Sequence, residues 1–241
     1  MYSEEEFEKV VAQKKPARGW EHLDKEYLST LPNLEGIKLE GHYYGNINLA
    51  GVNLCNASFS GDFSDTDFGW SILAGANFSF SNLQSSGFIR ANLRDANLLK
   101  ARAVFAEFAS ASLAGAQLSF IIATGCDFDL ADLSGADLSF GRFVRARFVG
   151  ANLSEAQLRG AILCKASMSD AYLKDAGLRD ADLSGCDFTG AYLKGAAIQG
   201  AITSESTSFI GAIMPNGERY VDRYESPAEI LNRYRDRELD E

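Results

Sequence analysis

The chain has 241 residues, 46% of them hydrophobic, which is enough for one domain with a substantial core. A formal charge of −10 and a pI near 4.8 argue against free nucleic acid as a direct partner, because phosphate contacts need clustered Lys and Arg. The longest apolar runs are far shorter than a membrane span, so we expect no membrane insertion.

Residues 1–31 predict a helical cap at the N-terminus. The acidic start MYSEEEFEKV differs from a secretory signal, which is basic and then apolar, so we expect a cytoplasmic protein. Ser3 and Glu6 fit a capping box, and Phe7 and Val10 would share one face of the short helix that follows.

A five-residue repeat dominates the rest of the chain. From Phe63 to Ile198 every fifth residue is large and apolar, except Ala103 and Ala123. The residue two positions earlier is small, usually Ala, with Ile121 as the bulky exception. Asn or Asp often stands between the two, and Ser-Gly often follows. Polar and glycine residues of this kind suit turns, so the spacing predicts short straight sides joined by corners.

Residues twenty apart form uniform columns. One column holds Leu73, Leu93, Leu113, Leu133, Leu153, Leu173 and Leu193, and the next holds Phe68, Phe88, Phe108, Phe128, Phe148, Met168 and Phe188. A period of five alone would mix Leu with Phe at random. The columns therefore predict a solenoid with four five-residue units in each coil, in which the large and small residues both point inward.

The early units are ragged. The step from Phe59 to Phe63 is four residues, so one residue is missing, and the corrected register places Phe59 beside Phe78. We expect a distorted first coil or two and then a regular shaft. About eight coils at roughly 4.8 Å each give a rod of about 40 Å.

This pattern resembles the pentapeptide-repeat family, whose unit is approximately A-(D/N)-L-x-x, over residues 32–214. The resemblance implies a right-handed quadrilateral β-helix, an all-β solenoid, here with short helical caps at both ends. It also implies a candidate function. The quinolone-resistance and gyrase-protecting members are described as mimics of duplex DNA that bind type II topoisomerases.

Residues 215–241 predict a tail and a helix. Ser226, Pro227 and Glu229 form a helix start signal of N-cap, first-turn Pro and capping-box Glu. We expect Ile230, Leu231 and Tyr234 either to cap the last coil or to form a homodimer contact, and we favour the cap because a solenoid end needs cover.

Signals for chemistry are nearly absent. His22 and His42 lie in no catalytic or metal-binding motif, and no CxxC pair exists. Cys126 and Cys186 share a column but stand three coils apart, roughly 14 Å, so they cannot bond to each other. The acidic runs occupy positions that the repeat fills with polar residues anyway. We predict no catalytic, metal-binding or cofactor-binding residues, and therefore a protein that is not an enzyme and acts through its surface.

One side of the predicted coil carries an apolar stripe. Its inward residues are Leu83, Ala103, Ala123, Phe143 and Leu163; its outward ones include Val104, Ile122, Val144 and Ile162; and its corners carry Phe80, Phe105, Phe120 and Phe140. Exposed stripes of this kind mark interfaces. The alternatives are that the aromatic corners pack on one another, or that a terminal segment covers them.

Two functions follow, and a third, a structural protein with no dedicated partner, stays open. The first is a protein-interaction scaffold whose stripe binds a partner of unknown identity. The alternative is a DNA mimic that binds DNA gyrase. Between His42 and Met214 there are sixteen acidic and twelve basic residues, a net charge near −4, whereas about 40 Å of duplex DNA carries some two dozen charges. Arg142, Arg145 and Arg147 form a basic patch, which favours the first function.

Overall fold

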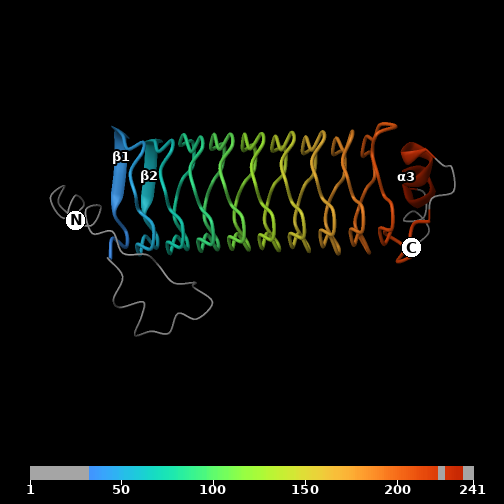
Figure 1. The fold of residues 1–241 in the computed structure, drawn as a ribbon, viewed down its shortest axis with the longest axis horizontal. Coiled ribbons are helices and arrows are strands. Elements are labelled where there is room, and N and C mark those ends of the chain that lie inside the picture. Colours follow the sequence, from blue (N-terminus) through green and yellow to red (C-terminus); the bar gives the residue numbers. More distant parts are fainter. Residues whose placement is uncertain (1–32, 222–225, 236–241) are drawn as a thin grey trace.

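The protein is a straight rod of stacked coils (Figure 1). The computed structural model describes residues 33–221 and 226–235. The N-terminal cap predicted for residues 1–31 lies outside the described residues, as do the side chains of His42 and Tyr234. No helix in the described part of the chain is long and apolar enough to cross a membrane.

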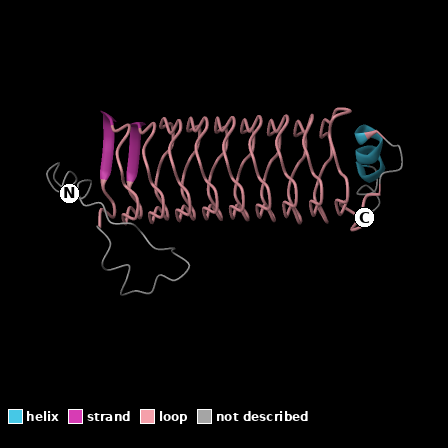
Figure 2. Cartoon of the chain, viewed as in Figure 1, coloured by secondary structure: helices cyan, strands magenta, loops and turns pink. Residues whose placement is uncertain are grey.

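Backbone pairing confirms four five-residue units in each coil. Ile72 pairs in parallel with Asn92, and Asn92 pairs with Ser112, so partners lie twenty residues apart. Each side of the coil is so short that most of the shaft consists of single bridges rather than strands (Figure 2). The rod is nevertheless held as a β-stack, because N–H and C=O groups of neighbouring coils bond along its length.

The core is a filled tube of side chains. Both predicted inward positions are buried throughout the regular shaft, the large residue and the small residue two before it. In the Phe column the rings from Phe68 to Phe148 stack nearly parallel, with centroids 4.8–4.9 Å apart. That spacing equals the distance between coils, so each ring packs on its copy above and below. Where Ser replaces the small Ala, as at Ser71 and Ser81, its hydroxyl donates to a carbonyl 2.6 Å away.

The predicted missing residue is confirmed at the first coils. Strand β1 (Lys38–Tyr43) pairs in parallel with β2 (Ser58–Asp62), with an irregularity between Glu40 and His42. Ser58 then pairs with Asn77, nineteen residues on, and Phe59 stacks on Phe78 at 4.2 Å. β2 is thus one residue shorter than the segment of β1 that it pairs with, and β1 and β2 are the only two strands of the described residues.

The corners explain the polar positions of the repeat. In a unit such as Ala91–Asp95, the Asn92 side chain accepts a hydrogen bond from the N–H of Arg94, and Asp95 has a positive φ of 57°. Asn and Asp favour this local bond, and Gly favours the positive φ. Asp127, Asp132 and Asp137 are half-buried and make this corner bond.

A second register change, which the sequence analysis missed, lies near the C-terminus. Asp182 pairs with Ile202 at a separation of twenty, but Asp187 pairs with Ser208 at twenty-one. One extra residue is therefore accommodated between Ile202 and Ser208, where the repeat pattern is lost. Phe209 consequently stacks on Phe188 at 5.2 Å.

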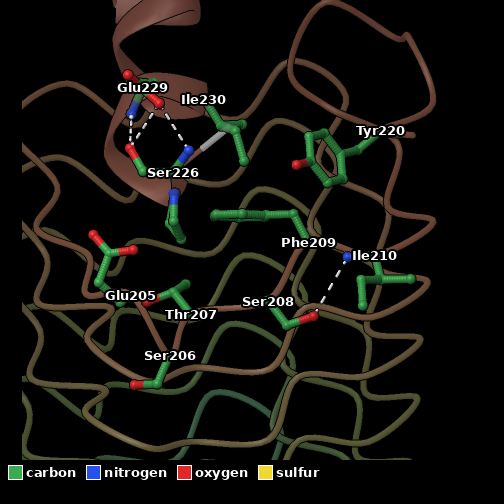
Figure 3. A pocket seen from close by; sticks show the side chains of 11 residues that line it. Glu205, Ser206, Thr207, Ser208, Phe209, Ile210, Tyr220, Ser226, Glu229 and Ile230 are labelled. Carbon is green, nitrogen blue, oxygen red and sulfur yellow. Dashed lines mark hydrogen bonds between the residues drawn. The ribbon is translucent and has the colours of Figure 1, made fainter. Parts of the chain in front are cut away.

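Helix α3 (Pro227–Arg235) lies at the C-terminal end of the rod (Figure 1). The predicted capping box is confirmed: Glu229 accepts from the Ser226 N–H at 2.8 Å, and the Glu229 N–H donates to the Ser226 hydroxyl at 3.3 Å (Figure 3). Ile230 and Leu231 are buried and join the core of the last coil.

Candidate protein-interaction surface

The predicted stripe lies on one side of the rod. We call this side the variable face, because its inward column is less uniform in residue type than the Leu and Phe columns. The residues of that column are all buried: Phe63, Leu83, Ala103, Ala123, Phe143, Leu163 and Leu183. Its outward aliphatic residues Val104, Ile122, Val144 and Ile162 are half-buried. The stripe is not purely apolar. Along the outward column whose residues pair from coil to coil, basic and apolar residues alternate: Arg102, Ile122, Arg142 and Ile162.

The corner that precedes the variable face carries Phe80, Lys100, Phe120, Phe140 and Gly160 in successive coils, and we call it the Phe corner. The Lys100 ammonium lies between two rings, 5.6 Å from the centroid of Phe80 and 5.8 Å from that of Phe120. Phe120 stacks on Phe140 at 5.2 Å. The Phe140 ring in turn lies against Gly160, where a Cβ would approach it to 2.7 Å. The corner residues therefore do pack on one another, as the alternative explanation of the stripe expected.

This packing leaves much of each ring in solvent. Phe80 is 67% exposed, Phe120 48% and Phe140 46%. Phe105, on the opposite corner of the variable face, is 63% exposed and leans on Gly125. Rings this exposed gain little from burial, so core packing does not account for them.

The exposed rings also occupy strained backbone positions. The four Phe residues have φ between 58° and 62°, a region that suits Gly and that costs a bulky residue roughly 1 kcal/mol. Six bulky apolar residues in the described part of the chain have positive φ: Trp70, Phe80, Phe105, Phe120, Leu130 and Phe140. The four Phe residues among them flank the variable face. Glycine does stand at the same corners in other coils, at Gly125 and Gly160.

The variable face is basic on an acidic protein. Its five middle segments, 79–85, 99–105, 119–125, 139–145 and 159–165, contain no Asp or Glu, but six bases: Lys100, Arg102, Arg142, Arg145, Arg159 and Lys165. The first and last coils of the face carry Asp62, Asp65, Asp180 and Asp182. Arg142, Arg145 and Lys165 form no ion pair with any described residue. Arg147, predicted in the same basic patch, lies on the next face and pairs with Asp129. Counting charge by column in the sequence would have found this asymmetry.

Other exposed apolar residues, which are not among the predicted site residues, lie elsewhere on the rod. Leu130 is 69% exposed on the corner diagonally opposite the Phe corner, in the column of Trp70, where Arg90 lies 4.6 Å above the indole ring. Ile202 and Ile210 are exposed near the C-terminal end. These residues are scattered, whereas the variable face groups its apolar residues with bases over five successive coils.

The four cysteines are free thiols. Burial raises the pKa of Cys126 and of Cys186 to about 12, and both thiols donate to carbonyls of the preceding coil. Cys164, on the variable face, has its pKa raised to about 11, first by burial and then by its hydrogen bond to the Asp182 carboxylate. Such thiols are weak nucleophiles.

Among the described residues no group of three His, Cys, Asp or Glu side chains could hold a metal ion.

Comparison with known proteins agrees with this geometry. The sequence model of the family described as pentapeptide repeats matches in eight copies, over residues 62–98, 111–150, 142–178, 151–190 and 166–202. No curated protein matches the chain.

Several solved structures are similar. HetL, a pentapeptide repeat protein involved in heterocyst differentiation regulation in the cyanobacterium Nostoc sp. strain PCC 7120, is 26% identical over 85% of this chain and 100% of its own, with a TM-score of 0.57. A pentapeptide repeat protein of the cyanobacterium Cyanothece 51142 is 33% identical over 35% of this chain and 61% of its own, with a TM-score of 0.31. QnrB1, a plasmid-mediated fluoroquinolone resistance protein, is 20% identical over 73% of this chain and 92% of its own, with a TM-score of 0.43.

Proposed function

The chain belongs to the pentapeptide-repeat family, and we propose that it is a non-enzymatic scaffold that binds a protein partner through its variable face. Family members form right-handed β-helices and are generally structural or interaction proteins. The site residues are the eight predicted ones: Phe80, Phe105, Phe120, Phe140, Val104, Ile122, Val144 and Ile162.

One observation carries the proposal: large exposed rings stand at positive φ where glycine would relieve the strain. A protein that tolerates local strain in order to present an aromatic side chain to solvent gains something other than stability from it. Aromatic residues and Arg are also the residue types most enriched at energetically important positions of protein interfaces.

The DNA-mimic alternative has a specific observation against it on this face. A mimic of duplex DNA must present closely spaced negative charges, and the variable face has none over five coils while holding six bases. Acidic residues on the other faces leave the alternative open to experiment.

The test is a pull-down from native cell extract with the tagged full-length chain. The variant changes Phe80, Phe120 and Phe140 to Ser, which is tolerated at this φ because Ser85 and Ser110 already adopt it. Leu130→Ser is the matched control on the diagonal corner. A partner that binds wild type and control but not the folded triple variant supports the proposal. Recovery of gyrase equally by all three would contradict it and favour the DNA mimic.

For the C-terminal end we propose that residues 215–241 cap the shaft and do not form a dimer. Ile230 and Leu231 are already buried within one chain, so they are not free to contact a second copy. Tyr234 is the remaining predicted contact. Light scattering after size exclusion should give a monomer, and a dimer that Ile230→Asp dissociates without unfolding would refute the cap.

A further inference from the structure

The partner class is restricted by the backbone of the variable face. The Ala103 N–H donates to the Ile122 carbonyl at 2.8 Å, the Ile122 N–H donates to Ala101 at 3.0 Å, and the Phe143 N–H donates to Ile162 at 2.7 Å. Bonds between coils thus run along the face and leave no free strand edge on it. A partner cannot add a strand here, and it must dock through side chains alone.

A partner that docks through side chains on a half-apolar surface has to satisfy its own backbone groups, and an α-helix does so within itself. The dimensions also suit a helix laid along the rod. Coils repeat every 4.8–4.9 Å, close to the 5.4 Å pitch of a helix, whereas same-face residues of an extended strand repeat about every 6.6 Å. From the coil of Phe80 to that of Gly160 the face spans about 20 Å, which corresponds to about 13 helical residues.

Charge sets the composition of that helix. The half-buried Ile122 and Ile162 alternate with the unpaired guanidinium of Arg142 along one column, and Arg145 and Lys165 border the face. A helix with an apolar stripe flanked by carboxylates complements this arrangement, and a basic helix is repelled. Nucleic acid fits less well, since the aliphatic centre offers phosphates no contact and the rest of the protein is acidic.

We propose that the variable face binds an acidic amphipathic α-helix of a partner protein, aligned with the rod axis. Apolar side chains of the helix contact Val104, Ile122, Val144 and Ile162, and its Asp and Glu residues pair with the bordering bases. The exposed rings of the Phe corner cover one flank of the helix. This inference rests on the proposed interaction role of the variable face.

The experiment is a selection on the full-length chain with a display library of 21-residue helices. Apolar positions follow an i, i+3, i+4, i+7 pattern, and the remaining positions are drawn equally from Glu, Lys, Gln and Ser. Enriched peptides are then measured by fluorescence anisotropy against wild type, Arg142→Glu, Ile122→Ser and the control Arg94→Glu. The control makes the same charge change on another side of the coil, the one whose inward residue is Leu93. Circular dichroism checks that each variant is folded.

We expect Glu to be enriched over Lys beside the apolar positions, and binding at least tenfold weaker to Arg142→Glu and to Ile122→Ser but unchanged for Arg94→Glu. Selected helices that are basic but bind Ile122→Ser much more weakly than wild type would overturn the partner class and leave the interaction role of the face standing. No enrichment, or binders indifferent to the face variants, would overturn both. Tighter binding of a 20-nucleotide dT strand, or of phosphatidylserine vesicles, to the same face would overturn the helical protein partner.

Discussion

Changing Gly141 to Ala is the most informative test of the packing, because it makes the unit GRFVR conform to the repeat and should still destabilise the protein. Gly141 occupies the small inward position where most units have Ala, and it is buried without a positive φ. An added Cβ would clash with the ring of Phe143 and would lie 3.1 Å from the Leu138 carbonyl oxygen. Phe143 replaces the usual Leu of its unit, so the glycine compensates for the larger ring.

The ring has little room to retreat. Phe143 is fully buried, and its centroid lies 6.1 Å from Phe128 and 5.7 Å from Phe148, both edge to face. Overpacking of this kind costs about 1–3 kcal/mol, while the loss of glycine freedom in the unfolded chain offsets about 0.4–1 kcal/mol. We therefore expect a net loss of about 1–2 kcal/mol.

The assay is equilibrium unfolding in urea. The matched control is Gly87→Ala, where the new Cβ meets only the Asp67 carboxylate at 3.5 Å, so we expect a gain of up to about 1 kcal/mol. In a Phe143→Leu background the Gly141→Ala penalty should vanish. A Gly141→Ala protein as stable as wild type, or a penalty that persists with Leu at 143, would show that the Phe143 ring does not restrict residue 141 to glycine.

Three further outcomes follow from the same core and corners. Phe128→Ala should cost about 3–5 kcal/mol in urea unfolding because it removes a fully buried ring between two stacked copies, and a cost below about 1.5 kcal/mol would contradict the stacked column. Cys126 and Cys186 should react with DTNB at pH 8 only after unfolding, so more than two fast thiols in the native protein would be inconsistent with their burial. Burial opposes ionisation of Asp137 and Asp182, but hydrogen bonds outweigh it and hold each pKa below its usual value. Their contribution is therefore present above about pH 4 and is lost as the pH falls through the folded pKa, so the melting temperature should drop on acidification, less steeply in Asp137→Asn.

The regular shaft was predictable because the spacing of the large apolar residues shows which residues of neighbouring coils stack on one another. Uniform Leu and Phe columns require a twenty-residue coil, and the four-residue step at Phe59 is visible as a gap in the pattern. The second register change was not predictable in the same way, since the stretch TSESTS around Glu205 has no large apolar residue to mark the extra position.

The candidate site was predictable only in part. The twenty-residue period of the sequence was enough to place the four aliphatic residues and the Phe corner on one side of the coil. It could not reveal that the Lys100 ammonium lies between two rings or that Phe140 lies on Gly160, because those contacts depend on side-chain rotamers. It also left the strain at the corners unseen, since a positive φ at a Phe is a property of the folded chain.

Hydroxyl-radical footprinting of the full-length chain, alone and in its partner complex from native extract, shows whether the variable face is the working surface. We expect oxidation of Phe120 and Phe140 to fall severalfold in the complex, while oxidation of Leu130, which is more exposed and lies on the diagonal corner, stays unchanged. Protection of Leu130 with Phe120 and Phe140 still freely oxidised would place the partner on another face, and the variable face would then not be the binding surface.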